Sequence, residues 1–188
     1  MRSKLSRCNR CDRLIVDGHI QEVFQFSLDY SVEAEYFFEK ISVRDMFNTH
    51  QENYITKPRI DAKRDNCKWL FEFAKRVIMQ HHNIIEKFAT KINRKDIDKW
   101  IENNIVNIIC MNHVEEKDGV DWHLDEEDTF AISIYDNGGI EFQNDKAEKI
   151  RHTTKNEIVA SIGNTHIIEH RSIVGEQPRK VIVIFVKK

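Results

Sequence analysis

The sequence lacks several features that would place a chain in a whole class of proteins. It has no run of about 18 consecutive apolar residues, the length that a membrane-spanning helix requires, so we expect no membrane segment. The N-terminal residues carry no apolar core of the kind found in a secretory signal. The 4 cysteines are too scattered for a disulfide framework, which favours a reducing intracellular compartment, cytoplasm or nucleus.

An excess of charge of one sign is also missing. The formal net charge is only -2, so no global positive field indicates nucleic acid. Basic residues are concentrated locally, in an arm over 1–13 and in a short patch over 57–64. Within the arm, Cys8-x-x-Cys11 is half of a zinc site, but no second pair follows at the usual spacing. Two exposed thiols are the alternative interpretation.

What is present is the composition of an ordinary globular domain. The chain has 188 residues, of which 40% are hydrophobic and 32% charged, and this length fits one domain with a substantial core. We predict a basic N-terminal arm over 1–13 and a single domain over 14–188. Within the domain, helical support is expected over 30–103 and a β-rich core over 104–187.

Hydrophobic periodicity separates these two parts. Apolar residues recur at helical spacing over 66–92, and shorter amphipathic stretches predict helices over 32–47 and 95–103, with a polar loop over 48–65. Strands are expected at 14–16, 20–30, 105–111, 120–123, 129–135, 140–143, 157–162, 166–174 and 180–186, with a turn at Gly138-Gly139. This order predicts an α+β fold, a double-stranded β-helix (jelly-roll) core backed by N-terminal helices.

The segment Asp121-Trp122-His123-Leu124-Asp125 is the strongest candidate for a functional site. If it lies at the end of a strand, residues i and i+2 point to the same side, so His123 and Asp125 aim at one point. A metal site needs a third ligand, and His170 is the natural donor, with His166 as a rival on the same face. Two histidines and one carboxylate form the facial set that binds non-haem Fe(II) with open coordination positions.

Three more residues suit the chemistry of such a site. Arg179, near the start of the last strand, could bind the carboxylate of a dianionic co-substrate through two parallel hydrogen bonds. Asn112 could donate to an oxygen of the same co-substrate, or could equally cap a turn. Tyr135 could direct its hydroxyl into the roll.

These residues resemble those of the AlkB-type Fe(II)/2-oxoglutarate dioxygenases. The stretch from Asn112 to Glu127 resembles the family's N-x-Y, its acidic-basic loop and its D-x-W-H-x-D-x-E segment. Lys57-Pro58-Arg59-Ile60-Asp61-Ala62 resembles the P-R-x-x-A of the nucleotide-recognition lid. Gly163-Asn164-Thr165, His170-Arg171 and Pro178-Arg179 resemble the C-terminal iron and 2-oxoglutarate segment.

The resemblance implies that His123, Asp125 and His170 bind Fe(II) and that Arg179 holds 2-oxoglutarate. It places Asn112 and Tyr135 at the co-substrate. Glu127, Trp122 and the lid residue Arg59 would face the substrate. The implied partners are molecular oxygen and an alkylated base in DNA or RNA, which is flipped out, hydroxylated on its N-alkyl carbon and so demethylated.

The chain also departs from the family pattern. Val114 stands where an aromatic residue is expected, and Val181 and Phe185 replace the Asn and Arg of the closing R-x-N-x-x-x-R motif. The stretch from Tyr135 to Phe142 resembles prolyl-hydroxylase-type enzymes as much as AlkB. Two alternatives therefore stand beside nucleic-acid demethylation: a protein side-chain hydroxylase with the same iron chemistry, and a non-catalytic jelly roll that binds a partner.

Overall fold

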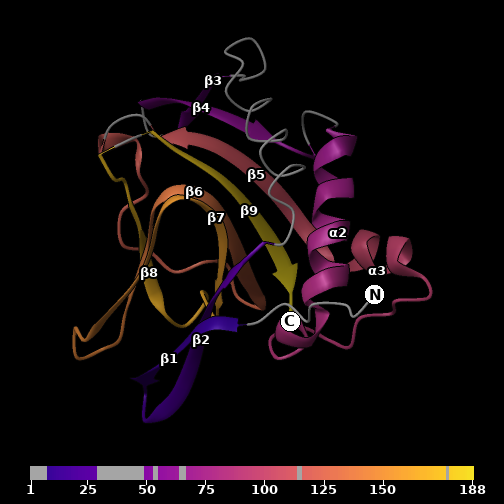
Figure 1. Cartoon of the computed structure of the whole chain (residues 1–188), viewed down its shortest axis with the longest axis horizontal. Coiled ribbons are helices and arrows are strands. Elements are labelled where there is room, and N and C mark those ends of the chain that lie inside the picture. The colour runs from indigo at the N-terminus through magenta and orange to yellow at the C-terminus, as the bar shows by residue number, and fades with distance from the viewer. Residues whose placement is uncertain (1–7, 29–48, 53–54, 64–66, 114–115, 177) are drawn as a thin grey trace.

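The computed structural model describes residues 8–28, 49–52, 55–63, 67–113, 116–176 and 178–188 (Figure 1). For 8–9, 49–52, 55–60 and 117 it describes the backbone alone. The helix predicted over 32–47 lies outside the described residues. The elements are β1 (Cys8–Val16), β2 (His19–Ser27), β3 (Thr49–Glu52), β4 (Ile55–Asp61), α2 (Lys68–Ile85), α3 (Ile97–Asn104), β5 (Ile105–His113), the 3-10 turn η2 (Glu116–Asp118), β6 (Thr129–Gln143), β7 (Lys149–Gly163), β8 (Glu169–Ile173) and β9 (Arg179–Lys187).

Two long strands, β6 and β7, give the sheet its shape. The first half of β6 pairs with β9 and with the end of β7, while its second half pairs with β8 and with the start of β7. The main sheet has the order β1-β2-β7-β6-β9-β5-β4-β3, and β8 joins on the far half of β6. Because β6 and β7 pass from one layer to the other, the sheet folds over itself into a roll (Figure 1).

The bend in β6 requires glycine. The register of β6 against β7 shifts between Tyr135 and Asn137, and Gly138 follows with a φ of 65°. A Cβ at Gly138 would lie 2.1 Å from the carbonyl oxygen of Ile173, so no other residue fits without moving the backbone. The predicted Gly138-Gly139 turn is therefore wrong, because these residues lie within a continuous strand that bends.

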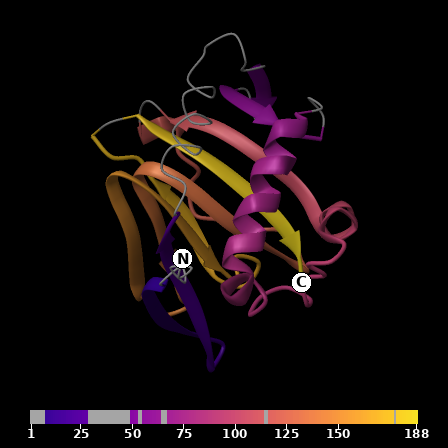
Figure 2. The same cartoon turned by 45° about the vertical axis from the view of Figure 1, so that its right-hand side comes forward.

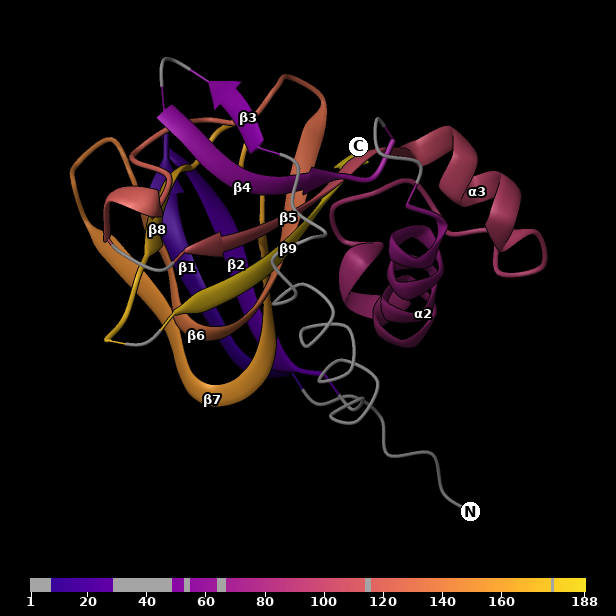
Figure 3. The same ribbon diagram turned by 90° about the horizontal axis from the view of Figure 1, so that it is seen from above.

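The two described helices cover the outer face of the main sheet. Leu70, Phe73, Val77 and Ile78 of α2 are fully or nearly fully buried, as the helical spacing predicts. They pack in one cluster with alternate residues of β2, β5, β6, β7 and β9. Figures 2 and 3 show α2 and α3 on this side of the strands and outside the roll. None of the described helices combines the length and hydropathy needed to cross a membrane.

The opposite face of the same strands lines the inside of the roll. Ala131 and Tyr135 of β6 lie there with Val181 and Val183 of β9, and they form a second cluster separate from the first. Strand periodicity accounts for this division, since successive residues point to opposite faces. The predicted α+β jelly roll backed by helices is confirmed.

Several predicted boundaries are corrected by the structure. The loop expected over 48–65 contains β3 and β4, an edge hairpin that continues the sheet beyond β5. Within the arm expected over 1–13, residues from Cys8 onward belong to β1. The helix expected over 66–92 ends at Ile85, where turns follow. The strand expected over 120–123 is reduced to an isolated bridge at His123.

Candidate metal centre

The segment 120–125 runs antiparallel to β8, and main-chain hydrogen bonds fix it there. The backbones of His123 and His170 exchange two hydrogen bonds, of 3.1 and 3.0 Å. The amide of Ser172 donates to the carbonyl oxygen of Val120 at 2.9 Å, and that of Asp125 donates to Thr165 at 3.0 Å. Two histidines that are far apart in the sequence are thus held side by side, with ring centroids 4.2 Å apart.

The tautomers of both histidines follow from their hydrogen bonds. Nδ1 of His123 lies 2.7 Å from the carbonyl oxygen of Asp121, and Nδ1 of His170 lies 3.2 Å from that of Ile168. A carbonyl can only accept, so Nδ1 carries the proton and donates in each ring. Nε2, with its lone pair, is therefore left to bind a metal, and carbonyl partners of this kind orient many metal-binding histidines.

Asp125 lies between the two Nε2 atoms. Its Oδ1 is 3.7 Å from Nε2 of His123, and its Oδ2 is 3.7 Å from Nε2 of His170. Oδ2 is buried and has no hydrogen-bond partner. One ligand atom from each of the three residues lies within 4.8 Å of the others. A buried carboxylate oxygen without a partner is costly unless something cationic binds it, so the residues present fit a divalent metal.

The three side chains differ in exposure. The His123 side chain is 36% exposed, whereas those of Asp125 and His170 are 7% exposed, so the site opens to solvent on the His123 side. Burial lowers the pKa of His170 to about 4, which keeps its ring neutral at physiological pH. A neutral imidazole is the form that binds a metal.

The outer face of the His123–His170 bridge is held by charges and an indole. Trp122 and Arg171, the neighbours of the two histidines, stack with the guanidinium carbon 4.8 Å from the ring centroid. Nε of Arg171 donates to the buried carboxylate of Glu141 at 2.7 Å, and Arg151 binds the same carboxylate. Burial alone would raise the pKa of Glu141, but these two hydrogen bonds outweigh it and lower the pKa. Trp122 thus belongs to a network of charged side chains on the outer face of the His123–His170 bridge.

Arg179 lies inside the roll and is only 3% exposed. Its Nη1 is 3.0 Å from Nδ1 of His113 and 3.5 Å from the hydroxyl of Ser172, and its guanidinium carbon is 5.2 Å from the ring centroid of Tyr135. Nε is buried without a hydrogen-bond partner. Burial lowers the pKa of Arg179 to about 10, a value at which the side chain stays protonated at neutral pH.

The charge of Arg179 has no carboxylate in ion-pair contact among the described residues. Asp136 is the nearby acid that favours the charged form, but its Oδ1 accepts the amide of Lys180 at 3.0 Å. Ser172 follows His170 by two residues on β8, so both point to the same side of the strand. Because Arg179 contacts Ser172, it faces the same interior as the three candidate ligands. Ser172 lies about 7 Å from His170 along β8.

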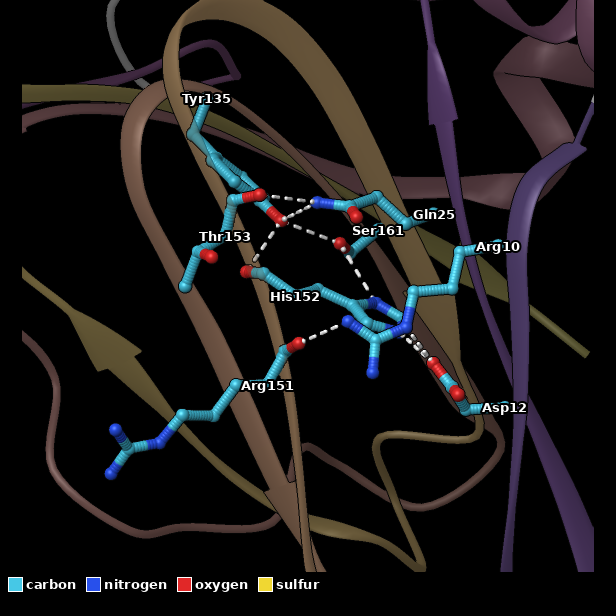
Figure 4. Close-up of polar contacts among 8 residues, drawn as sticks. All are labelled: Arg10, Asp12, Gln25, Tyr135, Arg151, His152, Thr153 and Ser161. Atoms are coloured by element: carbon cyan, nitrogen blue, oxygen red, sulfur yellow. Dashed lines mark hydrogen bonds and ion pairs between the residues drawn. The ribbon is translucent and has the colours of Figure 1, made fainter.

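Tyr135 directs its hydroxyl into a buried polar network (Figure 4). The hydroxyl donates to the carbonyl oxygen of His152 at 2.9 Å, accepts from the Gln25 amide at 3.1 Å and lies 2.7 Å from Ser161 Oγ. The His152 ring continues the network, with Nδ1 3.2 Å from Ser161 Oγ and Nε2 3.1 Å from Asp12 Oδ2. The Tyr135 hydroxyl is thus engaged in this network, and the Tyr135 ring lies against the guanidinium of Arg179.

The remaining candidates are placed less centrally. Asn112, on β5 opposite Lys180, has a buried Oδ1 without a partner. Glu127 is exposed in the turn before β6. His166, the rival third ligand, lies outside the cluster, with Nε2 2.5 Å from Nζ of Lys188.

The backbone of Arg59 lies in β4 opposite Met111, and its side chain falls outside the described residues. Cys11 is exposed and free, and the side chain of Cys8 is also outside them.

Sequence reasoning missed His113 and Ser172. Ser172 could have been found from strand periodicity, because it shares a face with His170. His113 gave no such signal, since its contact with Arg179 depends on the pairing of β5 with β9.

Comparison with known proteins reveals similarity only at the level of the fold. No family model matches the sequence. No curated protein matches it significantly. Among solved structures, the non-heme alpha-ketoglutarate-dependent epimerase SnoN from nogalamycin biosynthesis superposes with a TM-score of 0.55, over 88% of this chain and 78% of that one, at 7% identity. A putative oxygenase from Shewanella oneidensis has a TM-score of 0.46, over 88% and 81%, at 14% identity. The chain therefore has a fold also found in an alpha-ketoglutarate-dependent enzyme.

Proposed function

We propose that this chain is an Fe(II)- and 2-oxoglutarate-dependent oxygenase. His123, Asp125 and His170 would hold the iron, and Arg179 would bind the distal carboxylate of 2-oxoglutarate. One observation carries the proposal: a three-residue ligand set and a buried arginine without an ion-pair partner face the same interior of one roll. The fold shared with SnoN supports the assignment.

The charges of the parts add up. A ferrous ion with one carboxylate ligand keeps one net positive charge, a bound 2-oxoglutarate dianion reverses it, and the guanidinium restores neutrality. Iron in this position would supply the activation of molecular oxygen. One oxygen atom would go to succinate as carbon dioxide leaves 2-oxoglutarate, and the other would go to a C–H bond of the substrate. The protein contributes the fixed Nε2 atoms, the Arg179 charge and a buried interior that limits water.

The proposed substrate is an alkylated nucleic-acid base. The AlkB-like segment around Trp122 and His123 supports this class, as does the basic patch over 57–64, whose first part lies in β4. That patch carries Arg59 at a position paired with Met111, next to Asn112. Hydroxylation of an N-alkyl carbon on such a base would release the alkyl group as an aldehyde. A protein side chain is the competing substrate, favoured by the ring of Tyr135 beneath Arg179.

A matched pair of histidine variants tests the metal assignment. We expect His170→Ala to weaken Mn(II) binding at least about 100-fold and to reduce succinate formation from 2-oxoglutarate to background. His166→Ala removes an imidazole from a nearby position outside the cluster and should keep both properties. Calorimetry with Mn(II) and succinate quantification provide the two measurements. Normal metal binding by His170→Ala would refute the proposed ligand set.

The substrate class is tested with the iron-loaded protein on methylated oligonucleotides and on a peptide library. A nucleic-acid substrate should stimulate decarboxylation and lose affinity steeply as salt rises, with a slope of about -0.9 for each phosphate contacted on a duplex. Stimulation by peptides alone, with a flat response to salt, would favour the protein side-chain hydroxylase.

A further inference from the structure

Strand β9 offers Arg179 no polar neighbour on its own inner face. The next inward residues, Val181 and Val183, belong to the apolar cluster inside the roll, and Phe185 packs against it. Anything that orients the guanidinium must therefore come from other strands. The contacts found are His113 on β5, Ser172 on β8 and the ring of Tyr135 on β6.

His113 makes the shortest of the polar contacts. It is paired with Arg179 in the register of β5 and β9, it is 2% exposed, and its Nδ1 lies 3.0 Å from Nη1 of the arginine. A guanidinium has donors only, so Nδ1 must accept through its lone pair. An imidazolium carries a proton on both ring nitrogens and could not accept. The His113 ring is therefore neutral, with its proton on Nε2.

The neutrality of this acceptor matters more than its presence. An Asp or Glu at the same position would accept the hydrogen bond equally well. Its charge would pair with the guanidinium in a buried environment, where Coulomb interactions are strong. The arginine would then meet an incoming dianion with its charge already neutralised. Ser172 and the ring of Tyr135 are likewise uncharged, so these three contacts of the guanidinium leave its charge available.

We propose that His113 is a positioning residue, which orients Arg179 through a neutral acceptor and so keeps the guanidinium charge available for the carboxylate of a dicarboxylic co-substrate. This inference rests on the proposed function. It adds a residue of β5 to the site and a specific requirement, a hydrogen-bond acceptor without charge.

Three substitutions separate the acceptor from the charge. His113→Asn keeps a neutral acceptor. His113→Asp introduces a side chain of nearly the same size as Asn, but charged. His113→Leu fills the space without an acceptor. The protein is loaded with Mn(II), which does not turn over, and titrated with 2-oxoglutarate by calorimetry. Mn(II) affinity and thermal unfolding are measured for every variant.

We expect His113→Asn to bind 2-oxoglutarate within about 3-fold of the parent, His113→Leu to bind about 10-fold more weakly, and His113→Asp at least about 30-fold more weakly. Mn(II) affinity should be the same in all of them. Equal affinities for the Asn and Asp proteins would show that His113 is merely structural and overturn the inference. If the Asp protein does not fold, equal affinities for the Asn and Leu proteins overturn it instead.

The proposed function fails in a different way. A parent protein that binds Mn(II) but no 2-oxoglutarate would overturn the co-substrate assignment, and with it the role of His113. A parent that binds 2-oxoglutarate with no difference among the three variants leaves the oxygenase proposal standing and removes His113 alone.

Discussion

The two faces of β6 and β9 belong to different environments, although their residues alternate along the same strands. Phe130, Ile132 and Ile182 point outward and are completely buried beneath the helices in a hydrophobic cluster. Tyr135 and Arg179 point inward, into a roll that also holds buried histidines, serine and glutamine. A shift of one residue in register would therefore exchange the core for the site.

The inner face is itself of two kinds. Around Tyr135, each buried polar group has partners, as the contacts of Gln25, Ser161 and His152 show (Figure 4). Around the candidate metal centre, Asp125 and Arg179 each keep a buried polar atom without a hydrogen-bond partner. Polar groups inside a protein are nearly always satisfied, and these two atoms also face one interior, so together they support the proposed ligand site. The satisfied network around Tyr135 therefore stabilises the roll, whereas the unsatisfied atoms of Asp125 and Arg179 belong to the proposed site.

The largest expected effect is at Asp125, a residue of the inner face with an unsatisfied polar atom. Asp125→Asn keeps the shape of the side chain but removes the charge that a divalent ion requires. We expect Mn(II) affinity to fall at least about 1,000-fold, while the stability of the metal-free protein stays within about 1 kcal/mol or rises, because a buried charge is removed. Calorimetry and urea unfolding without metal measure the two quantities. A large loss of metal-free stability would mean that Asp125 is a structural residue.

The outer face should respond in the opposite way. Phe130→Ala removes a completely buried ring between β6 and the helices, where Phe130 contacts Phe88 with ring centroids 5.7 Å apart. We expect the free energy of unfolding to fall by about 3–5 kcal/mol, from lost burial and the remaining cavity. The folded fraction should still bind Mn(II) with nearly the parental affinity. Leu124→Ala, at a side chain that is 50% exposed, is the control and should change stability by less than about 0.5 kcal/mol.

The outer face was also the part of the fold that the sequence made easiest to predict. Helical spacing identified α2, because its buried residues recur every three or four positions. The class of fold followed from short apolar runs. The hairpin of β3 and β4 was missed because its residues are largely polar and read as a loop. The bend of β6 was misread as a turn, since two glycines indicate a chain reversal as readily as a strand that changes layers.

The inner face could be predicted only in part. The pair of His123 and Asp125 has a local spacing, and His170 could be proposed because iron chemistry demands a third ligand. The network around Tyr135 has no such signal, since His152 and Asp12 are separated by 140 positions. Partners of that kind are set by strand pairing and by burial, which the order of residues does not reveal.

The smallest expected effect is at His152, in the hydrogen-bonded network of the inner face around Tyr135. Burial lowers the pKa of this histidine from 6.5 to about 4, although the hydrogen bond to Asp12 opposes the shift. The unfolded chain therefore binds a proton more readily than the folded protein does. The stability that neutral His152 contributes is fully present above about pH 6.5 and is lost as the pH falls towards 4.

The size of this contribution follows from the shift of the pKa. It corresponds to a loss on the order of 3 kcal/mol between pH 7 and pH 4. His152→Gln cannot titrate, so its stability, measured by urea unfolding across this range, should decline less steeply than that of the parent by this amount. His170 titrates in both proteins and cancels in the difference. Parallel curves would mean that the folded protein accepts a proton on His152 without penalty, and that the polar network around Tyr135 tolerates a buried charge.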